Sequence, residues 1–200
     1  GAHTHAVAVL QGTDAHCADF VTADGGACAP RELGAVHLST QADGKVLVEA
    51  AVYGLPPGGA YGFHIHTYGD ASSRAGTAAG GHYNPDNNEH RLPPADGGVA
   101  PRRHAGDLGN LQTHDAQNVY WYSLAQASLR LDDVVGRAIV VHEARDGGDG
   151  EACSQSGSSG RRVMLGVIGW RNEAATGVAP RVDRGAPAAG GGGGQKTVVP

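Results

Sequence analysis

Histidine is the residue type with the most chemistry to offer in this sequence. The 200 residues include 11 histidines, against 15 lysines and arginines together. His64 and His66 lie two residues apart in an apolar run, so on a β-strand both rings would point to the same side and could bind one metal ion. Phe63 and Ile65 would then face the other layer.

Further candidate ligands follow along the chain, and together with this pair they lie in five segments flanked by glycine. The full set is His64, His66, His82, His90, His104, Asp107 and His142. Ligation by many nitrogens and one carboxylate suits Cu(II) and Zn(II), whereas calcium and magnesium prefer oxygen ligands. We therefore predict a copper or zinc site. The alternative is a group of surface-loop histidines that only form hydrogen bonds in turns.

The elements that must position these residues read as short strands. Runs rich in Val, Ile or Leu cover residues 6–10, 35–38, 46–53, 62–66, 119–124, 127–131, 137–142 and 163–168. The chain also holds 33 glycines and 10 prolines. Long helices are disfavoured, because a glycine inside a helix costs about 1 kcal/mol relative to alanine. Eight short strands separated by turn residues predict an all-β, antiparallel sandwich or barrel.

Three stretches interrupt the strand pattern. Residues 13–32 form a long connection that carries two cysteines, and residues 68–106 form a longer one that carries three histidines. A structureless segment of that length inside a domain is usually functional or disordered, and the histidines favour function. Residues 171–200, with five consecutive glycines, predict a flexible tail behind a single domain of residues 1–170.

Composition excludes several functional classes. The net charge of −5 argues against a general binder of nucleic acid or anionic membranes. No apolar run approaches the roughly 20 residues of a membrane-spanning helix. The three cysteines, Cys17, Cys28 and Cys153, allow at most one pair within the chain. No C-x-x-C motif is present, so a thiolate zinc site is not expected.

Five motifs together resemble the copper/zinc superoxide dismutase family. They are GFHIHTYGD (62–70), GGHYNP (80–85) with a histidine at position 90, HAGDLGN (104–110), GRAIVVHE (136–143) and GRRVMLGVIGW (160–170). Their order and internal spacing match the family over about residues 5–170. The resemblance implies an eight-stranded antiparallel Greek-key β-barrel or sandwich, with long metal-binding and electrostatic loops.

The resemblance also implies two sets of metal ligands that share one histidine. Copper would be held by His64, His66, His82 and His142. Zinc would be held by His82, His90, His104 and Asp107. His82 would then be an imidazolate bridge between the two metals.

Two further residues take roles from the resemblance. Asp146, four residues after His142, would link a copper-ligand histidine to a zinc-ligand histidine and so fix both rings. The alternative is an aspartate that only forms a turn. Arg162 would attract and orient the superoxide anion, and its neighbour Arg161 is the alternative for that role.

The activity implied is the dismutation of superoxide to dioxygen and hydrogen peroxide through a Cu(II)/Cu(I) cycle. His82 would take up a proton for the peroxide product. Two other functions stay open on the same fold. One is a metal-binding or copper-chaperone module, although relatives of that kind lose a copper ligand or the channel arginine. The other is a copper-only relative, against which the zinc ligands argue. A secreted or otherwise oxidising location is expected, with the cytoplasm as the alternative, and a homodimer is one expected assembly.

The cysteines depart from the family pattern. Gly76 and Leu165 stand where the family has its disulfide, whose loss would remove a constraint near Arg162. We expect a Cys17–Cys28 pair that closes the 13–32 insert. Pairing of Cys153 with Cys17 or with Cys28 is the alternative. We also expect the insert to border the copper channel.

Overall fold

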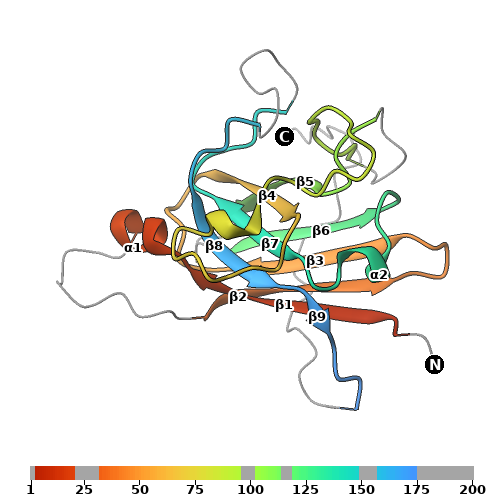
Figure 1. Ribbon diagram of the computed structural model, residues 1–200. Coiled ribbons are helices and arrows are strands. Elements are labelled where there is room, and N and C mark those ends of the chain that lie inside the picture. The colour runs from red at the N-terminus through yellow and green to blue at the C-terminus, as the bar shows by residue number, and fades with distance from the viewer. Residues whose placement is uncertain (1–2, 21–31, 96–101, 114–118, 149–156, 175–200) are drawn as a thin grey trace, which may run out of the picture.

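Nine antiparallel strands form one closed sheet in the computed structural model, among the residues that the structure describes (Figure 1). These residues are 3–20, 32–95, 102–113, 119–148 and 157–174. The strands are β1 (His5–Gly12), β2 (Glu32–Thr40), β3 (Val46–Val52), β4 (Ala60–His66), β5 (Asp107–Thr113), β6 (Tyr120–Gln126), β7 (Ala138–His142), β8 (Arg162–Val167) and β9 (Gly169–Trp170). The helices are α1 (Asp14–Phe20), α2 (Leu131–Val134) and the 3-10 helix η1 (Thr77–Ala79).

The strand order shows a Greek-key barrel. Neighbours in the sheet run β2-β3-β6-β5-β4-β7-β8-β1-β9, and β1 also pairs with β2, so the sheet closes on itself. β3 lies beside β6 although β4 and β5 separate them in sequence, which is the long return connection of a Greek key. β8 and β9 are separated only by Ile168 and both pair with β1, so they serve as one interrupted strand. The predicted eight-stranded antiparallel barrel is confirmed.

Alternation of side chains along the strands builds the interior of the barrel. In β3, every second residue from Val46 to Val52 is buried and those between are half-buried. In β4, Phe63 and Ile65 lie in the main apolar core. A second, smaller apolar cluster consists of Ala79, Ala138, Val140 and Leu165. It joins η1 to β7 and β8, so the loop between β4 and β5 is packed against the barrel wall.

One predicted strand is wrong. Residues 127–130 form a turn and irregular chain, and α2 begins at Leu131. Leu129, Leu131 and Val134 are nevertheless buried in the core. These residues are apolar because they pack against the sheet, not because they pair within it.

One strand is missing from the prediction. β5 begins within the HAGDLGN motif, where glycine, aspartate and asparagine are residues that strands usually avoid. β5 forms because β4 pairs with it, from Ala60 opposite Gln112 to His64 opposite Asp107. Tertiary pairing therefore overrides weak local propensity, and it places Asp107 beside the histidines of β4.

The insert of residues 13–32 begins with helix α1, which Figure 1 shows beside the barrel near the start of β8. Residues 21–31 and 149–156 lie outside the described residues, and with them Cys28 and Cys153. The expected disulfide therefore stays a prediction, as does the flexible tail, of which 175–200 are not described. No helix in the described part of the chain is long and apolar enough to cross a membrane.

Candidate metal centre

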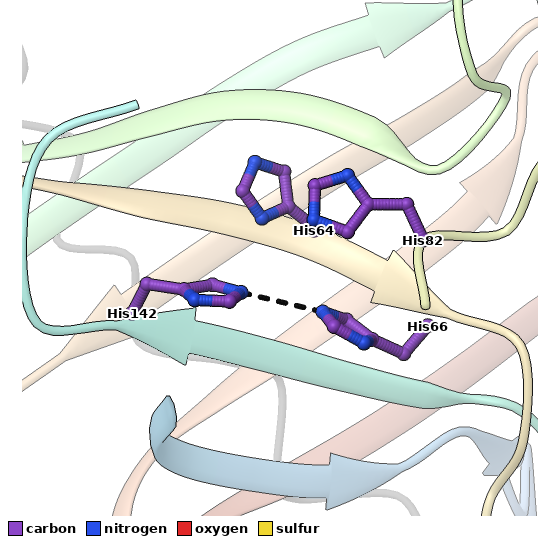
Figure 2. A group of neighbouring side chains, drawn as sticks. All are labelled: His64, His66, His82 and His142. Carbon is purple, nitrogen blue, oxygen red and sulfur yellow. Dashed lines mark hydrogen bonds between the residues drawn. The ribbon is translucent and has the colours of Figure 1, made fainter. Parts of the chain in front are cut away.

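Two strands supply the first three histidines of the site. β4 ends with His64 and His66, whose rings lie on the side opposite Phe63 and Ile65 because side chains alternate along a strand. β7 ends with His142, and β4 and β7 are direct neighbours in the sheet. The barrel wall thus holds these three rings on one outer patch, as Figure 2 shows.

Backbone pairing brings His82 back to this patch. His66 and His82 form an isolated β-bridge, and the amide of Tyr83 donates to the carbonyl of Ile65 at 2.8 Å. The ring of His82 stacks on that of His64, with centroids 4.0 Å apart. The first four candidate ligands are therefore brought together, and one ring nitrogen from each lies within 4.8 Å of the others.

Hydrogen bonds orient each ring so that one nitrogen faces the centre of this group. His66 donates from Nδ1 to the carbonyl of Gly80 at 2.8 Å, and His142 from Nδ1 to that of Gly160 at 3.0 Å. Their Nε2 atoms lie 3.3 Å apart (Figure 2). His64 uses Nε2 for an outer contact, which leaves Nδ1 facing inward.

Two buried nitrogens in the group have no hydrogen-bond partner. They are Nδ1 of His64 and Nε2 of His82. A buried polar atom without a partner costs free energy, about 1–3 kcal/mol, and requires an explanation. Four inward nitrogens, two of them unpartnered, fit a metal ion that accepts imidazole ligands, as copper does.

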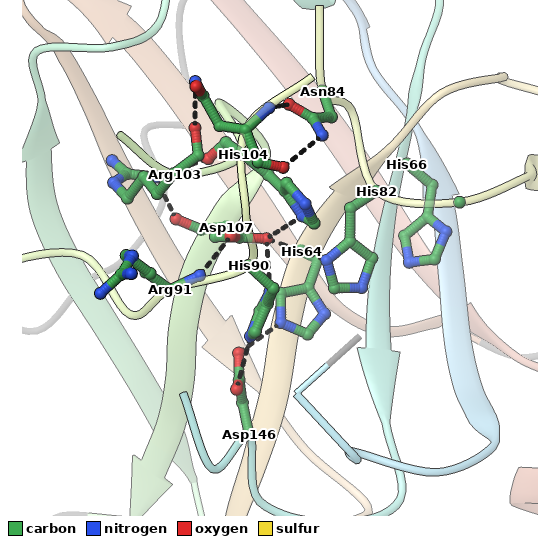
Figure 3. A network of polar contacts seen from close by, with 12 residues as sticks. His64, His66, His82, Asn84, His90, Arg91, Arg103, His104, Asp107 and Asp146 are labelled. Atoms are coloured by element: carbon green, nitrogen blue, oxygen red, sulfur yellow. Dashed lines mark hydrogen bonds and ion pairs between the residues drawn. The ribbon is translucent and has the colours of Figure 1, made fainter. Parts of the chain in front are cut away.

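A second group converges on one oxygen of Asp107. Oδ1 of Asp107 lies 2.9 Å from Nδ1 of His82, 3.0 Å from Nδ1 of His90 and 3.2 Å from Nδ1 of His104 (Figure 3). All four side chains are at least nine-tenths buried. Three imidazoles and one carboxylate are a donor set that zinc takes in a tetrahedral site.

The turn that carries His104 and Asp107 is held by a glycine in close contact with β4. Gly106 accepts from the amide of Ile65 at 2.8 Å and donates to the carbonyl of Tyr83 at 2.9 Å. A Cβ atom on Gly106 would lie 2.3 Å from the carbonyl oxygen of Ile65. Only glycine allows this approach, which places the second group against the first.

Asp146 links the two groups from outside. Its Oδ2 accepts from Nε2 of His64 at 2.7 Å, and its Oδ1 accepts from Nε2 of His90 at 2.8 Å. The amide of Gly148 donates to the same Oδ1 at 2.8 Å. Asp146 is fully buried, so it is more than the turn aspartate considered above. By accepting both Nε2–H groups, it leaves both Nδ1 atoms facing inward.

Burial sets the charge state of the first group. It lowers the pKa of His64 to about 3 and that of His142 to about 4, and it lowers the pKa of His66 well below its usual value. Burial is the largest cause of these shifts, and the neighbouring ring of His82 contributes to all three. At neutral pH these three rings are uncharged, which is the form that binds a metal.

Asp107 and His90 of the second group, and Asp146 beside it, carry charge instead. Burial opposes ionisation of Asp107, but hydrogen bonds from His104 and His82 outweigh it and hold the pKa of Asp107 far below its usual value. Hydrogen bonds from His64 and His90 likewise keep the pKa of Asp146 low despite burial. Burial alone would lower the pKa of His90, but its bonds to both carboxylates raise it to about 9.

Arg162 and Arg161 lie in different places. The guanidinium of Arg162 donates from Nη1 to the carbonyl of Gly76 and from Nη2 to that of Gly80, each at 2.5 Å. Gly80 also accepts from His66, so one carbonyl joins this arginine to the first group. Arg161 is exposed and pairs with Glu143 at 2.7 Å. Of the two, Arg162 is the cation beside the histidines.

The sequence analysis missed two arginines next to the site. Arg103 is buried, and its Nη1 donates to the carbonyls of His104 at 3.0 Å and Asp107 at 2.6 Å. Arg137 donates to the carbonyl of Thr67 at 2.6 Å and lies 3.9 Å above the ring of Tyr83. Each lies next to a candidate ligand in sequence or in space. Neither occurs at a sequence spacing from the ligands that would have predicted its place beside the site.

Comparison with known proteins agrees with this geometry. The family model described as copper/zinc superoxide dismutase matches residues 32–168. Superoxide dismutase [Cu-Zn] A of Xenopus laevis is 39% identical over 143 residues, which are 68% of this chain and 89% of that protein. Superoxide dismutase [Cu-Zn] of Kluyveromyces lactis is 42% identical over 118 residues, which are 56% of this chain and 71% of that protein.

A solved structure is similar as well. The crystal structure of the clock protein EA4 superposes with a TM-score of 0.66 at 30% sequence identity, covering 86% of this chain and 97% of that one. The family match spans more than half of the chain and includes every histidine of both groups. The chain therefore belongs to the copper/zinc superoxide dismutase family.

Proposed function

We propose that this chain catalyses the dismutation of superoxide at a histidine-bridged copper/zinc site. The observation that carries the proposal is the sharing of His82 between two converging donor groups, with Nδ1 in one and Nε2 in the other. Copper and zinc are the metals of the family, and the donor sets fit them. Copper supplies a one-electron couple between Cu(II) and Cu(I) when bound.

The residues divide into two ligand sets under this proposal. Copper is held by His64, His66, His82 and His142. Zinc is held by His82, His90, His104 and Asp107. Asp146 orients one ring of each set, and its position between His64 and His90 supports that role.

The chain itself supplies substrate attraction and a proton. Arg162 presents a cation near His66 and His142, whose pKa values it lowers in addition to burial. A local cation raises the encounter rate of a small anion even when the net charge of the protein is negative. Nε2 of His82 has no protein partner, so it can hold the proton that the peroxide product takes up. Two superoxide anions and two protons yield one dioxygen and one hydrogen peroxide.

Location and assembly are separate proposals. An oxidising compartment, with the cytoplasm as the alternative, is supported by the cysteines. A homodimer is supported only by the family resemblance. The Cys17–Cys28 disulfide stays a prediction because Cys28 and Cys153 lie outside the described residues.

The direct test measures metal content and turnover on the same sample. Protein loaded with copper and zinc is expected to hold about one of each per chain and to remove superoxide rapidly, whereas the metal-free protein removes none above the uncatalysed rate. Full loading without turnover would instead support the alternative, a metal-binding or copper-chaperone module.

Zinc binding to the metal-free protein at pH 7 is expected to release about one proton from His90. The pKa of about 9 lies above the usual value of 6.5, so His90 stays protonated between these pH values until zinc displaces the proton. Titration calorimetry in buffers of different ionisation enthalpy measures the number released. It should fall as the pH rises past 9, and His90→Asn should abolish it. Release that is unchanged in that variant would contradict the assignment.

A further inference from the structure

Residues at the start of α1 form hydrogen bonds with two parts of the chain that Arg162 connects. One is the backbone at the start of β8, and the other is the loop that receives the guanidinium. Thr13 donates from its amide to the carbonyl of Val163 at 2.9 Å and from Oγ1 to the carbonyl of Arg162 at 2.6 Å. The next residue, Asp14, donates from its amide to the carbonyl of Arg74 at 3.0 Å. Two consecutive residues thus tie the backbone of Arg162 to the loop that receives its side chain.

An ion pair reinforces the second tie. Asp14 accepts from Nε of Arg74 with both carboxylate oxygens, at 2.9 and 3.1 Å, and Nη2 lies 2.7 Å from Oδ1. Arg74 is two residues before Gly76, and the turn between them is closed by a hydrogen bond from Gly76 to Ser73. The ion pair is exposed, so it adds modestly to the backbone hydrogen bond between the same two residues, next to the carbonyl that accepts from Arg162.

Apolar packing holds this loop on one side, where Ala79 of η1 lies in the smaller apolar cluster with Leu165. A cavity of about 160 Å³ lies at the junction with α1, lined in part by Thr13, Asp14, Cys17, Arg74, Gly76 and Leu165. On the side that borders the cavity the loop has few packed atoms, so the hydrogen bonds from Thr13 and Asp14 contribute to its position there. The two glycine carbonyls that hold the guanidinium depend on this loop for their place.

On the basis of the proposed function, we infer that Thr13 and Asp14 are positioning residues for Arg162. They act through the loop at Gly76 and Gly80 and through the first residues of β8. The insert of this chain thereby links the loop at Gly76 to strand β8. This is the place where Gly76 and Leu165 stand instead of the disulfide that the family resemblance implies.

The direction in which Asp14→Asn changes the superoxide rate constant distinguishes a positioning role from a purely electrostatic one. Asp14→Asn removes a negative charge, which alone would speed the arrival of an anion. Loss of positioning predicts the opposite, a superoxide rate constant about 2- to 5-fold lower at low ionic strength, with a weaker dependence on salt. Asp43→Asn is the matched control, because Asp43 is an exposed partner of Lys45 in the turn between β2 and β3.

The experiment compares Asp14→Asn, Thr13→Val and Asp43→Asn, all at full copper and zinc content. The first two are expected to slow superoxide removal, and the exchange Asp14→Arg with Arg74→Asp to restore most of it. Amide exchange in the metal-free proteins gives a second readout, in which Asp14→Asn speeds exchange at Gly76 and Gly80 while Asp43→Asn does not. The inference is overturned if Asp14→Asn matches Asp43→Asn in both rate and exchange. Failure of the proposed function looks different, because the fully loaded wild-type protein would then remove no superoxide; failure of the role of Arg162 alone would show as an unchanged rate in Arg162→Gln.

Discussion

Replacing Asp146 by asparagine is expected to weaken copper binding about 10- to 100-fold and zinc binding less. The change keeps the size of the side chain but converts one acceptor oxygen into an NH₂ donor. Asp146 now accepts three hydrogen bonds, from His64 at Oδ2 and from His90 and Gly148 at Oδ1. An amide cannot accept on both sides.

The position with two donors should keep the oxygen. The amide of Gly148 cannot change its role, so the NH₂ group will face His64. His64 must then accept at Nε2 and carry its proton on Nδ1, the atom that faces the copper ligands. The proton blocks that ligand, whereas the inward nitrogen of His90 is preserved.

Competition with a chelator measures the affinity of each metal, and the nitrogen signals of labelled imidazoles in the metal-free protein report the tautomer of His64. Asp132→Asn, on an exposed aspartate of α2, is the control and should leave both affinities unchanged. Equal loss of copper and zinc, with His64 still protonated at Nε2, would contradict the argument.

The ligands that lie on one strand could be predicted from the sequence, because side chains alternate between the two faces of a strand. His64 and His66 converge because alternate residues of a strand share a face, and Phe63 and Ile65 enter the core for the same reason. The barrel was predictable as well, since short apolar runs between turn residues have few other arrangements.

The remaining ligands could be placed only by resemblance. His82 and His90 come from irregular chain, where no period relates one side chain to the next. Their positions depend on tertiary contacts such as the bridge of His82 to His66 and the approach of Gly106 to Ile65. Gly157 is a similar case, because a Cβ atom there would lie 2.0 Å from Oδ1 of Asp146.

Local propensity also misled the prediction in two places. It favoured a strand at residues 127–131, where the leucines are buried by packing, and it overlooked β5, where pairing with β4 decides the conformation. The same oversight concealed Arg103, whose role depends on the ends of β5 and β6 meeting around it.

Arg103 joins the turn that carries His104 and Asp107 to the end of β6. Besides the two carbonyls at the turn, it donates from Nη2 to Oε1 of Gln126 at 2.7 Å and to Oγ of Ser128 at 2.9 Å. Its own carbonyl accepts from Asn88 at 3.1 Å. A buried guanidinium with four acceptors is costly to lose, because the acceptors stay buried without a donor.

Replacing Arg103 by methionine is therefore expected to lower the free energy of unfolding of the metal-free protein by about 2–4 kcal/mol. In a chain of this size that corresponds to a melting midpoint roughly 5 to 15 °C lower. Zinc affinity should fall too, since the turn bearing His104 and Asp107 loses its brace. Arg102→Met is the control, because the neighbouring arginine is exposed and the change in charge is the same. Equal midpoints for the two variants would show that the guanidinium is not what holds the turn, and Arg103→Lys, which keeps the charge without the planar fork, should fall between them.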